Sequence, residues 1–404
     1  MKDNKILNIT TDVKWIGVLD HDIRTFDIVM ETKYGATYNS YFINAQKKTI
    51  VEATKEKFWD VYLEKLKQVV NPEEIEYIVM NHTEPDHSGN AMNLLKIAPR
   101  AKIVGTGNVI RYMTDLMNMD FPHIIVKDGD TLDLGNKTLR FISAPNLHWP
   151  DSMYSYLEED KVLFTCDSFG SHYCHEEMYD DKVGNFDDAF RYYFDVILKP
   201  FSKFMLKAIE KVRQLEISAI CTGHGPLLTK NWKRYVDLTE QYAKEAVAFP
   251  EFGRVLVAYV SAYGKTKILA ESITQGLSQV EGIHADLCDI EKMPAGDLAD
   301  KITRASGIII GSCTINQNTL PQIYTLFALM SPLRDKGKPA GCFGSYGWSG
   351  EAQKIIEANL STLKLNLVTD NIFVKFTPSA DDIARCVEYG KSFADKVLDI
   401  KCGG

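Results

Sequence analysis

The pattern of hydrophobic and polar positions changes near residue 250. Before that point, short apolar runs predict strands, each followed directly by a polar loop. The clearest runs cover residues 76–80, 138–142, 162–166 and 217–220. After it, strand-like runs at 254–259, 307–311, 339–344 and 367–376 alternate with helical segments such as 267–277. This alternation is typical of a doubly wound α/β domain.

The same pattern predicts further elements of the first part and a domain boundary. Strands are expected at 13–19, 28–32 and 40–43, and helices at 55–69, 187–195 and about 230–248. The segment Phe249-Pro250-Glu251-Phe252-Gly253 separates the last of these helices from the next strand. Proline and glycine interrupt regular structure, so we place two domains at residues 1–250 and 251–404.

Composition narrows the possible classes of protein. A chain of 404 residues with 45% hydrophobic residues has enough apolar material for two cores. Its net charge of −8 argues against nucleic acid as a general partner. The polar start Met1-Lys2-Asp3-Asn4-Lys5 does not resemble a signal peptide, and no apolar run is long enough for a membrane span. We therefore expect no membrane partner and a cytoplasmic location.

Metal-binding side chains follow the predicted strands of the first part. His82-Thr83-Glu84-Pro85-Asp86-His87 comes directly after the strand at 76–80 and carries four of them. His148, Asp167 and His224 lie in the loops after the next three strands. Strands of one sheet bring such loops together, so we expect these seven side chains to converge. Imidazoles and carboxylates without thiolates suit iron, manganese or zinc.

Three loops of the second part have the character of a cofactor site. The first, Ser261-Ala262-Tyr263-Gly264-Lys265-Thr266, offers hydroxyls and N–H groups at a helix N-terminus, where a phosphate is stabilised. It is not a nucleotide P-loop, because Tyr259 occupies the position of the first glycine. The other two loops fall at the carboxyl ends of later strands, and they read Ser312-Cys313-Thr314-Ile315-Asn316-Gln317-Asn318 and Ser345-Tyr346-Gly347-Trp348-Ser349-Gly350.

The metal-binding pattern resembles the metallo-β-lactamase superfamily, whose first loop usually reads His-x-His-x-Asp-His. Here Glu84 stands in place of the second His. This variant, followed by a lone His, an Asp and a final His, is similar to the flavodiiron proteins. The loop at 261–266 resembles the flavodoxin phosphate loop, and the order of the two domains matches the same family.

The resemblance implies an α/β fold, in which an N-terminal αββα metallo-β-lactamase-like sandwich precedes a C-terminal doubly wound flavodoxin-like domain. It also implies FMN and two non-haem iron ions as cofactors. Carried over by position, it assigns one iron to His82, Glu84 and His148, the other to Asp86, His87 and His224, and the bridge to Asp167.

The activity that the resemblance implies is reduction of dioxygen to water, of nitric oxide to nitrous oxide, or of both. The electrons are expected from a separate donor, such as rubredoxin or a reduced flavin-type carrier. No Cys-x-x-Cys pair occurs among the eight cysteines, so we expect no fused rubredoxin-like iron–thiolate domain and a donor that is a separate protein. The family also implies a head-to-tail homodimer or a dimer of dimers.

Residues around the irons are expected from the same comparison. Tyr193, chosen over Tyr192, and His172 are candidates for roles in catalysis, and His175 for a supporting contact or a place in the substrate pocket. The alternative for the two tyrosines is that both only pack in the helix interface. Some family members carry a His where this chain has Asp27. Any substrate preference tied to that His cannot be transferred.

Two other classes of protein share part of the pattern. A dinuclear zinc hydrolase would use the same first domain but has no evident use for Glu84 or the flavodoxin-like domain. A pure electron-transfer flavoprotein would carry a degenerate metal site, whereas every ligand position is intact. An absorption spectrum with metal analysis would separate the three.

Overall fold

The computed structural model describes residues 5–27, 30–248, 251–368 and 370–399. The chain divides into two compact units, Met1–Lys244 and Glu245–Gly404. The predicted boundary at 250/251 falls beside residues 249–250, which lie outside the described ones. Within the described residues, no helix combines the length and the apolar character that a membrane span needs.

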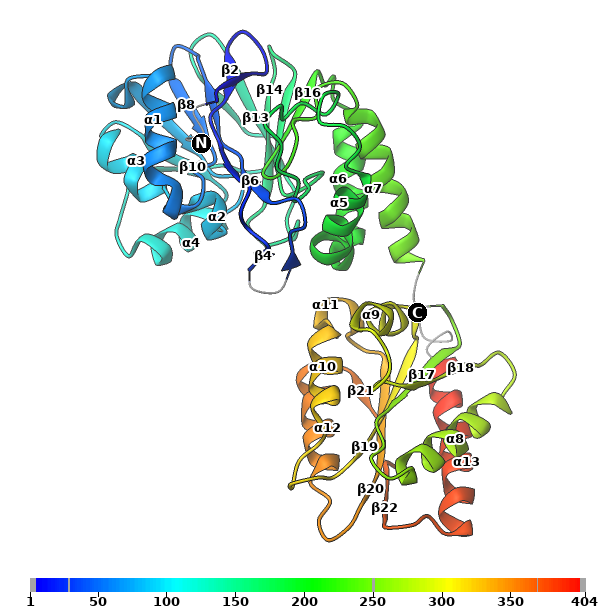
Figure 1. Cartoon of the computed structure of the whole chain (residues 1–404). Helices are drawn as coiled ribbons and strands as arrows, with labels where there is room; N and C mark the ends of the chain where they lie inside the picture. The colour runs from blue at the N-terminus through cyan, green and yellow to red at the C-terminus, as the bar shows by residue number, and fades with distance from the viewer. Residues whose placement is uncertain (1–4, 28–29, 249–250, 369, 400–404) are drawn as a thin grey trace. The chain divides into compact units, whose positions relative to one another are not determined.

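Two sheets packed face to face form the middle of the first unit (Figure 1). The seven-stranded sheet has the order β1 (Leu7–Asn8), β2 (Val13–Trp15), β7 (Tyr41–Ile43), β8 (Lys48–Val51), β9 (Ile75–Val79), β10 (Lys102–Gly105) and β11 (His123–Ile125). The five-stranded sheet has the order β12 (Thr131–Asp133), β13 (Thr138–Ser143), β14 (Met153–Leu157), β15 (Val162–Cys166) and β16 (Ala219–Thr222).

Helices cover the outer face of each sheet. The first sheet carries α1 (Trp59–Val69), α3 (Ala91–Ile97) and α4 (Gly107–Met117), and the second carries α5 (Asp187–Tyr193), α6 (Ser202–Val212) and α7 (Trp232–Val247). Alternating side chains explain the layers, because successive residues of a strand point to opposite faces. In β9, Ile78 packs under the helices while Val79 packs between the sheets. The predicted αββα sandwich is confirmed.

Two N-terminal strand predictions need correction or remain partly open. The predicted strand at 13–19 is two strands, because β2 ends at Trp15 and β3 (Val18–Asp20) pairs with β6 (Ala36–Tyr38) instead. A Cβ on Gly17 would lie 2.5 Å from the Tyr38 carbonyl oxygen, so the chain crosses β6 closely where it changes partner. Of the strand predicted at 28–32, residues 28–29 lie outside the described residues, and β5 (Met30–Glu31) pairs with β4 (Thr25–Phe26).

The helix predicted at 187–195 also differs from its prediction. It ends as α5 at Tyr193 and continues as a π-helical turn (Phe194–Leu198) and a 3₁₀ turn (Lys199–Phe201) before α6 begins. Pro200 has no N–H to donate to the carbonyl four residues earlier, so a regular α-helix cannot run through this point. Such π-helical turns are frequent at functional sites.

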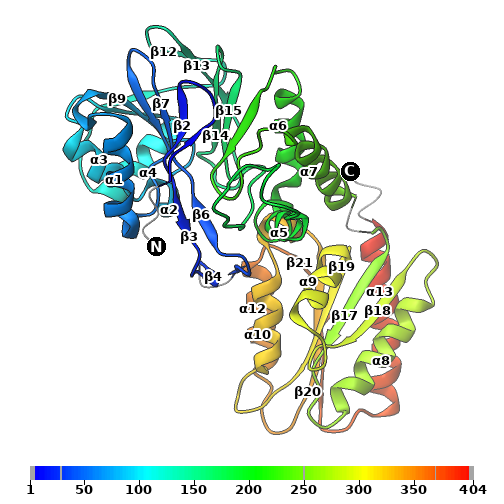
Figure 2. The same ribbon diagram turned by 45° about the horizontal axis from the view of Figure 1, so that its top comes forward.

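The second unit is a single parallel sheet between two helical layers (Figures 1 and 2). Its strand order is β18 (His284–Asp289), β17 (Arg254–Tyr259), β19 (Gly307–Cys313), β20 (Pro339–Tyr346) and β21 (Asn366–Leu367), and β22 (Ile372–Lys375) also pairs with β20. One face packs on α8 (Lys265–Ser278) and α13 (Ala380–Asp399), and the other on α9 (Ala295–Arg304), α10 (Pro321–Leu329) and α12 (Ala352–Thr362). The predicted flavodoxin-like domain is confirmed.

The strand predicted at 367–376 is divided into β21 and β22, with residue 369 outside the described residues. The two strands pair with successive parts of β20. Between them the Asn371 side chain replaces a backbone partner, since its Oδ1 accepts the Cys342 N–H at 2.8 Å. The order reverses between β17 and β19, and doubly wound sheets bind ligands at the carboxyl ends of strands beside this point.

Candidate metal centre and flavin pocket

The loop after β9 presents four of the predicted ligands within six residues. Its chain turns at once into α2 (Pro85–Ser88), a single turn with Glu84 at its N-cap and proline in its first position. The Ser88 hydroxyl donates to the Thr83 carbonyl at 2.7 Å and closes the turn. This compact loop places His82 and Glu84 in one group of ligands, and Asp86 and His87 in another.

The first group contains His82, Glu84, His148 and one oxygen of Asp167. The Glu84 Oε2 atom lies 3.3 Å from His82 Nε2 and 2.9 Å from His148 Nε2. Asp167 Oδ2 lies 3.5 Å from each of the same two nitrogens. Ligand atoms that share one ion at about 2.1 Å are about 3 Å apart, so these four atoms fit one metal ion.

The second group contains Asp86, His87, His224 and the other oxygen of Asp167. Asp86 Oδ2 lies 3.0 Å from His224 Nε2 and 3.5 Å from His87 Nε2. Asp167 Oδ1 lies 3.1 Å from His87 Nε2 and 3.6 Å from His224 Nε2. Each oxygen of Asp167 therefore faces one group, which is the geometry of a bridging carboxylate.

Buried carboxylate oxygens that lack hydrogen-bond partners support a metal site here. Among the described residues, Asp86 Oδ1 and Asp167 Oδ2 are buried without a hydrogen-bond partner. Buried carboxylate oxygens are costly unless they pair or coordinate a metal. The structure thus brings all seven predicted ligands together in the expected two groups, and their role as iron ligands stays a proposal.

The protonation of the metal-free cluster follows from its charges. Burial opposes a charged imidazole, but Asp86 and Asp167 raise the pKa of His87 to about 10. Burial likewise opposes the carboxylate form of Glu84, and the hydrogen bonds from His148 and His82 nevertheless lower its pKa to about 2. Metal ligation requires neutral imidazoles, so an ion entering this site displaces protons.

Asp151 is a supporting residue that sequence reasoning missed. Its buried carboxylate lies 3.2 Å and 3.3 Å from His82 Nδ1 through its two oxygens. Oδ2 also accepts the Thr83 N–H at 2.8 Å and the Thr83 hydroxyl at 2.7 Å. A carboxylate at Nδ1 holds the proton there and leaves Nε2 free for a metal. The available signal was its position, three residues after His148.

Glu52 and Cys166 lie close to the His87 ring, and the sequence analysis did not predict either residue. The His87 Nδ1 atom lies 3.5 Å from Cys166 Sγ, and the ligand atoms of all three side chains are within 4.8 Å of one another. Burial raises the pKa of Glu52 to about 7. Gly223 completes the packing, because a Cβ there would lie 2.6 Å from His87 Cε1. These contacts fix the ring in position.

Tyr193 and His172 lie beside the second group, and their roles in catalysis stay a prediction. The Tyr193 hydroxyl donates to Asp167 Oδ1 at 3.0 Å, and its burial raises its pKa well above the ordinary value. The His172 ring packs 4.9 Å from Tyr193 and 5.4 Å from His224 between centroids. Burial, followed by the nearby His224, lowers the pKa of His172 to about 3, so this imidazole is neutral.

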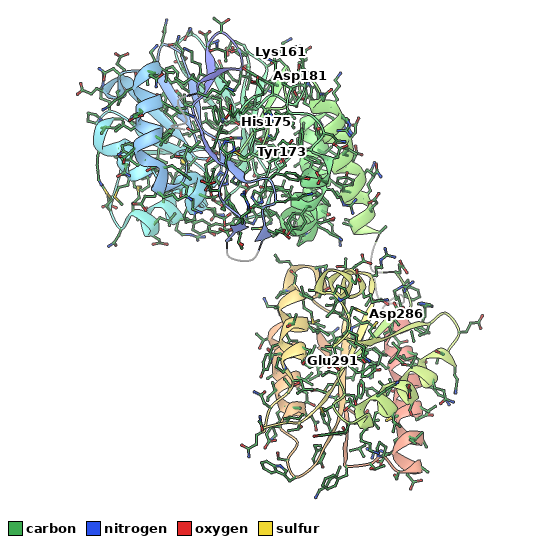
Figure 3. The ribbon with its side chains drawn as sticks, viewed as in Figure 1. Lys161, Tyr173, His175, Asp181, Asp286 and Glu291 are labelled. Carbon is green, nitrogen blue, oxygen red and sulfur yellow. The ribbon has the colours of Figure 1, made fainter. Side chains whose placement is uncertain are left out.

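His175 and Asp27 have different surroundings. His175 accepts the Glu177 N–H at 3.1 Å and stacks on Tyr173 at 6.4 Å (both rings are labelled in Figure 3), which places it on a neighbouring loop surface rather than on the ligands. Asp27 follows Phe26, whose ring lies 5.4 Å from that of His224. Burial raises the pKa of Asp27, and repulsion from the carboxylates Glu84 and Asp86 raises it further. Asp27 is therefore close enough to the ligand cluster to interact with its charges.

The first loop of the second unit leads into the N-terminus of α8. Gly264 is its N-cap with φ of 76°, a conformation that suits glycine. The Ser261 Oγ accepts the Lys267 N–H at 3.3 Å, and the buried Thr266 hydroxyl lies 2.9 Å from Ser345 Oγ. Ala262 lies in the same loop. Hydroxyls beside a helix N-terminus fit the phosphate of FMN.

A pocket of about 380 Å³ adjoins this loop at the carboxyl ends of β19 and β20. That volume falls within the usual range for small-molecule sites, about 300–1,000 Å³. Its wall includes eleven of the predicted residues, namely Tyr263, Lys265, Cys313, Thr314, Ile315, Asn316, Ser345, Tyr346, Gly347, Trp348 and Ser349. Tyr263 is 87% exposed and Trp348 is 76% exposed, so both rings are available to a planar ligand.

Some residues differ from the prediction for this pocket. Ser261, Ala262, Gly264, Thr266, Ser312 and Gly350 do not line it. Ser312 supports it from behind, with its hydroxyl donating to the Cys313 carbonyl and accepting from Thr319. Gln317, which belongs to the predicted loop at 312–318, lines the pocket, and so do Phe376 and Thr377, which were not predicted. The last two follow β22, so the rule that ligands bind at the carboxyl ends of strands could have found them.

Comparison with known proteins defines the class of the chain. Residues 36–225 match the family model described as ODP family beta lactamase, and residues 257–390 match the flavodoxin model. A flavo-diiron protein of Clostridium acetobutylicum is 37% identical over 403 residues, covering 97% of this chain and 99% of that protein. A protein of Moorella thermoacetica named nitric oxide reductase is 33% identical, covering 97% and 98%.

A solved structure agrees over both units. The rubredoxin oxygen:oxidoreductase of Desulfovibrio gigas has a TM-score of 0.73 and 27% sequence identity, covering 99% of this chain and 100% of that one. The fold and site therefore define a two-domain oxidoreductase that joins a metallo-β-lactamase-like domain to a flavodoxin-like domain. The chain belongs to the flavodiiron protein family. Its cofactors are accordingly FMN and a non-haem diiron centre.

Proposed function

We propose that this oxidoreductase reduces dioxygen to water, nitric oxide to nitrous oxide, or both. The observation that carries the proposal is the pair of ligand groups joined by the two oxygens of Asp167. Reduced FMN would supply two electrons and a pair of ferrous ions another two, which matches the four electrons that dioxygen takes up to become two waters. Joining two nitric oxide molecules into nitrous oxide and one water takes two electrons and two protons.

The protein's own residues organise this chemistry. His82, Glu84 and His148 would hold one iron, and Asp86, His87 and His224 the other, with Asp167 between them. Tyr193 keeps its proton and donates it in a hydrogen bond to Asp167 Oδ1, which holds the bridging carboxylate in its orientation. His172 stays neutral beside them, and neither of its ring nitrogens has a hydrogen-bond partner among the described residues.

In the second unit, the proposed roles are binding roles. Ser261 and Thr266 would hold the FMN phosphate with the N-terminus of α8. The loops at 312–316 and 345–350 would hold the ring system, with Tyr263, Tyr346 or Trp348 against it. The exposure of Tyr263 and Trp348 supports this proposal, because a planar ligand would cover surface that is otherwise open to water.

The choice between the two gases is the finer question. The relatives point to each of them, since one is named for nitric oxide and another for oxygen. Steady-state rates with dioxygen and with nitric oxide, using one reduced donor, test the proposal directly. Failure to reduce either gas with two irons and FMN bound would contradict it. Comparing wild type with Asp27→His then shows whether this position sets the preference.

The zinc hydrolase stays the second candidate, because its scaffold is the same. Metal analysis and a flavin spectrum of the purified protein discriminate between them. Two irons and one FMN per chain support the reductase, whereas two zinc ions, hydrolysis and no flavin would support the hydrolase.

We further propose a separate electron donor such as rubredoxin or a reduced flavin-type carrier, a cytoplasmic location, and a homodimer or dimer of dimers. These proposals rest on family resemblance, and rubredoxin appears in the name of one solved relative.

In the proposed head-to-tail dimer, the flavin of one copy serves the irons of the other. Mixing a copy without iron (His82→Ala with Asp167→Ala) and one without flavin (Ser261→Ala with Thr266→Val) should restore activity. No recovery despite proven subunit exchange would contradict this arrangement.

A further inference from the structure

Besides the cluster of proposed metal ligands, the first unit contains a cavity at its surface. Its volume is about 210 Å³, and it is lined by Glu31, Lys33, Tyr34, His172, Asp188, Ala189 and Tyr192. Three separate segments supply these residues, namely β5 with the loop that follows it, the loop after Asp167, and α5. Glu31, Lys33, Asp188 and Tyr192 are exposed, whereas Ala189 and His172 are buried. The cavity thus has a rim at the surface and a buried floor.

Hydrogen bonds hold the rim together across these segments. The Tyr34 hydroxyl donates to Asp188 Oδ2 at 2.5 Å, and the Glu31 N–H donates to the Tyr192 hydroxyl at 3.3 Å. Lys33 lies 3.9 Å from the same Asp188 oxygen. Both tyrosines are therefore fixed at their hydroxyls, which leaves their rings as walls.

His172 forms the floor and separates the cavity from the proposed diiron centre by one ring. It is 3% exposed, and within the described residues neither ring nitrogen has a hydrogen-bond partner. Its ring centroid lies 4.4 Å from Phe26, 4.9 Å from Tyr193 and 5.4 Å from His224. Tyr193 is bonded to Asp167, and His224 is a proposed ligand. A molecule at the floor is thus one side chain away from the metal-binding groups.

The size of the cavity limits what it can admit. Sites for drug-sized ligands occupy about 300–1,000 Å³, and a single water takes about 30 Å³ of liquid volume. A cavity of 210 Å³ is therefore small for an extended organic substrate but ample for a few diatomic molecules. The charged side chains Glu31, Lys33 and Asp188 lie at the exposed rim, and the rest of the lining is a methyl group, two phenol rings and an imidazole ring.

We propose that this cavity is the entrance through which a small neutral substrate, dioxygen or nitric oxide, reaches the diiron centre, with His172 as the inner gate. The inference rests on the proposed function, because only a gas-reducing centre needs such a route. In this proposal, the small side chain of Ala189 keeps the inner part of the cavity open. The proposal also assigns His172 a position between entrance and centre, where a change of its side-chain rotamer would open the way.

Ala189→Leu tests the route, because a larger apolar side chain at this buried helical position would fill the inner part of the cavity. Ala358→Leu is the matched control, being the same change at an exposed helical position of the other unit. Reduced, iron-loaded proteins would be mixed rapidly with nitric oxide, and the association rate followed by absorbance. We expect Ala189→Leu to bind about tenfold more slowly or worse, which corresponds to a modest added barrier. Ala358→Leu should bind at the wild-type rate.

A crystal of the wild-type protein under xenon pressure gives a readout that needs neither iron nor turnover. Xenon density beside Ala189 and His172 supports the proposal, as does its loss in Ala189→Leu. Absence of xenon from the wild-type cavity, or an Ala189→Leu protein that binds nitric oxide at the wild-type rate, overturns it. A reduced wild-type protein that binds no nitric oxide contradicts the proposed function instead, and the xenon experiment still decides whether the cavity admits small neutral molecules.

Discussion

Asp151→Asn should weaken iron binding although Asp151 is not a ligand. The carboxylate serves two neighbours, since both oxygens approach His82 Nδ1 and Oδ2 also accepts two hydrogen bonds from Thr83. An amide has one acceptor oxygen and one donor group. If its oxygen stays with Thr83, its NH₂ faces His82 Nδ1 and favours the tautomer protonated at Nε2. That tautomer has no lone pair at the nitrogen facing Glu84.

The opposite amide orientation is no better. Its oxygen would accept from His82, but its NH₂ would then meet the Thr83 N–H in a buried site, and an unsatisfied buried donor costs about 1–3 kcal/mol. Loss of a residue that orients a metal-binding histidine typically weakens metal binding about 10- to 100-fold, or about 1.4–2.8 kcal/mol. The two estimates agree, so we expect a loss of affinity in this range for the His82 group.

The assay is an anaerobic titration of metal-free protein with ferrous iron against a coloured chelator. Asp237→Asn is the matched control, because its side chain is 62% exposed and pairs with Arg213 at the surface. Its iron affinity should equal that of wild type. Circular dichroism would verify that both variants are folded, and FMN content should be unchanged. Wild-type iron affinity in a folded Asp151→Asn protein would refute the tautomer argument.

Three further predictions concern the metal centre and the flavin site. Asp167→Asn should lose the dinuclear centre yet keep FMN, as measured by iron and flavin content, and full iron with full activity would contradict the bridging role. Thr266→Val with Ser261→Ala should weaken FMN by about 1.5–3 kcal/mol for each charge-assisted bond lost, with iron unchanged, and unaltered flavin affinity would show that the loop is misassigned. Iron affinity should rise with pH through the neutral range, because metal-free His87, with a pKa raised to about 10, must release its proton to bind, and a flat profile would contradict this.

The local sequence determined the strands, the ligand loops and the class of cofactor. A buried strand needs an apolar run, and a loop that directly follows it must start at the sheet edge, so the placement of His82, His148, Asp167 and His224 could be inferred without coordinates. The same reasoning found the phosphate loop after β17. It failed at the strand predicted for 13–19, because the change of partner at Gly17 depends on the distant Tyr38 carbonyl.

Only the tertiary structure decided how the ligands are divided and supported. The orientation of Asp167, with one oxygen toward each group, depends on Tyr193 and His87, which are 26 and 80 residues away in sequence. Asp151 is 69 residues from His82, and the His224 Nδ1 contact with the Thr37 carbonyl spans 187 residues. No local pattern encodes such contacts. They arise when two sheets and their helices pack, because close packing and the need to satisfy every buried polar group leave these side chains few other positions.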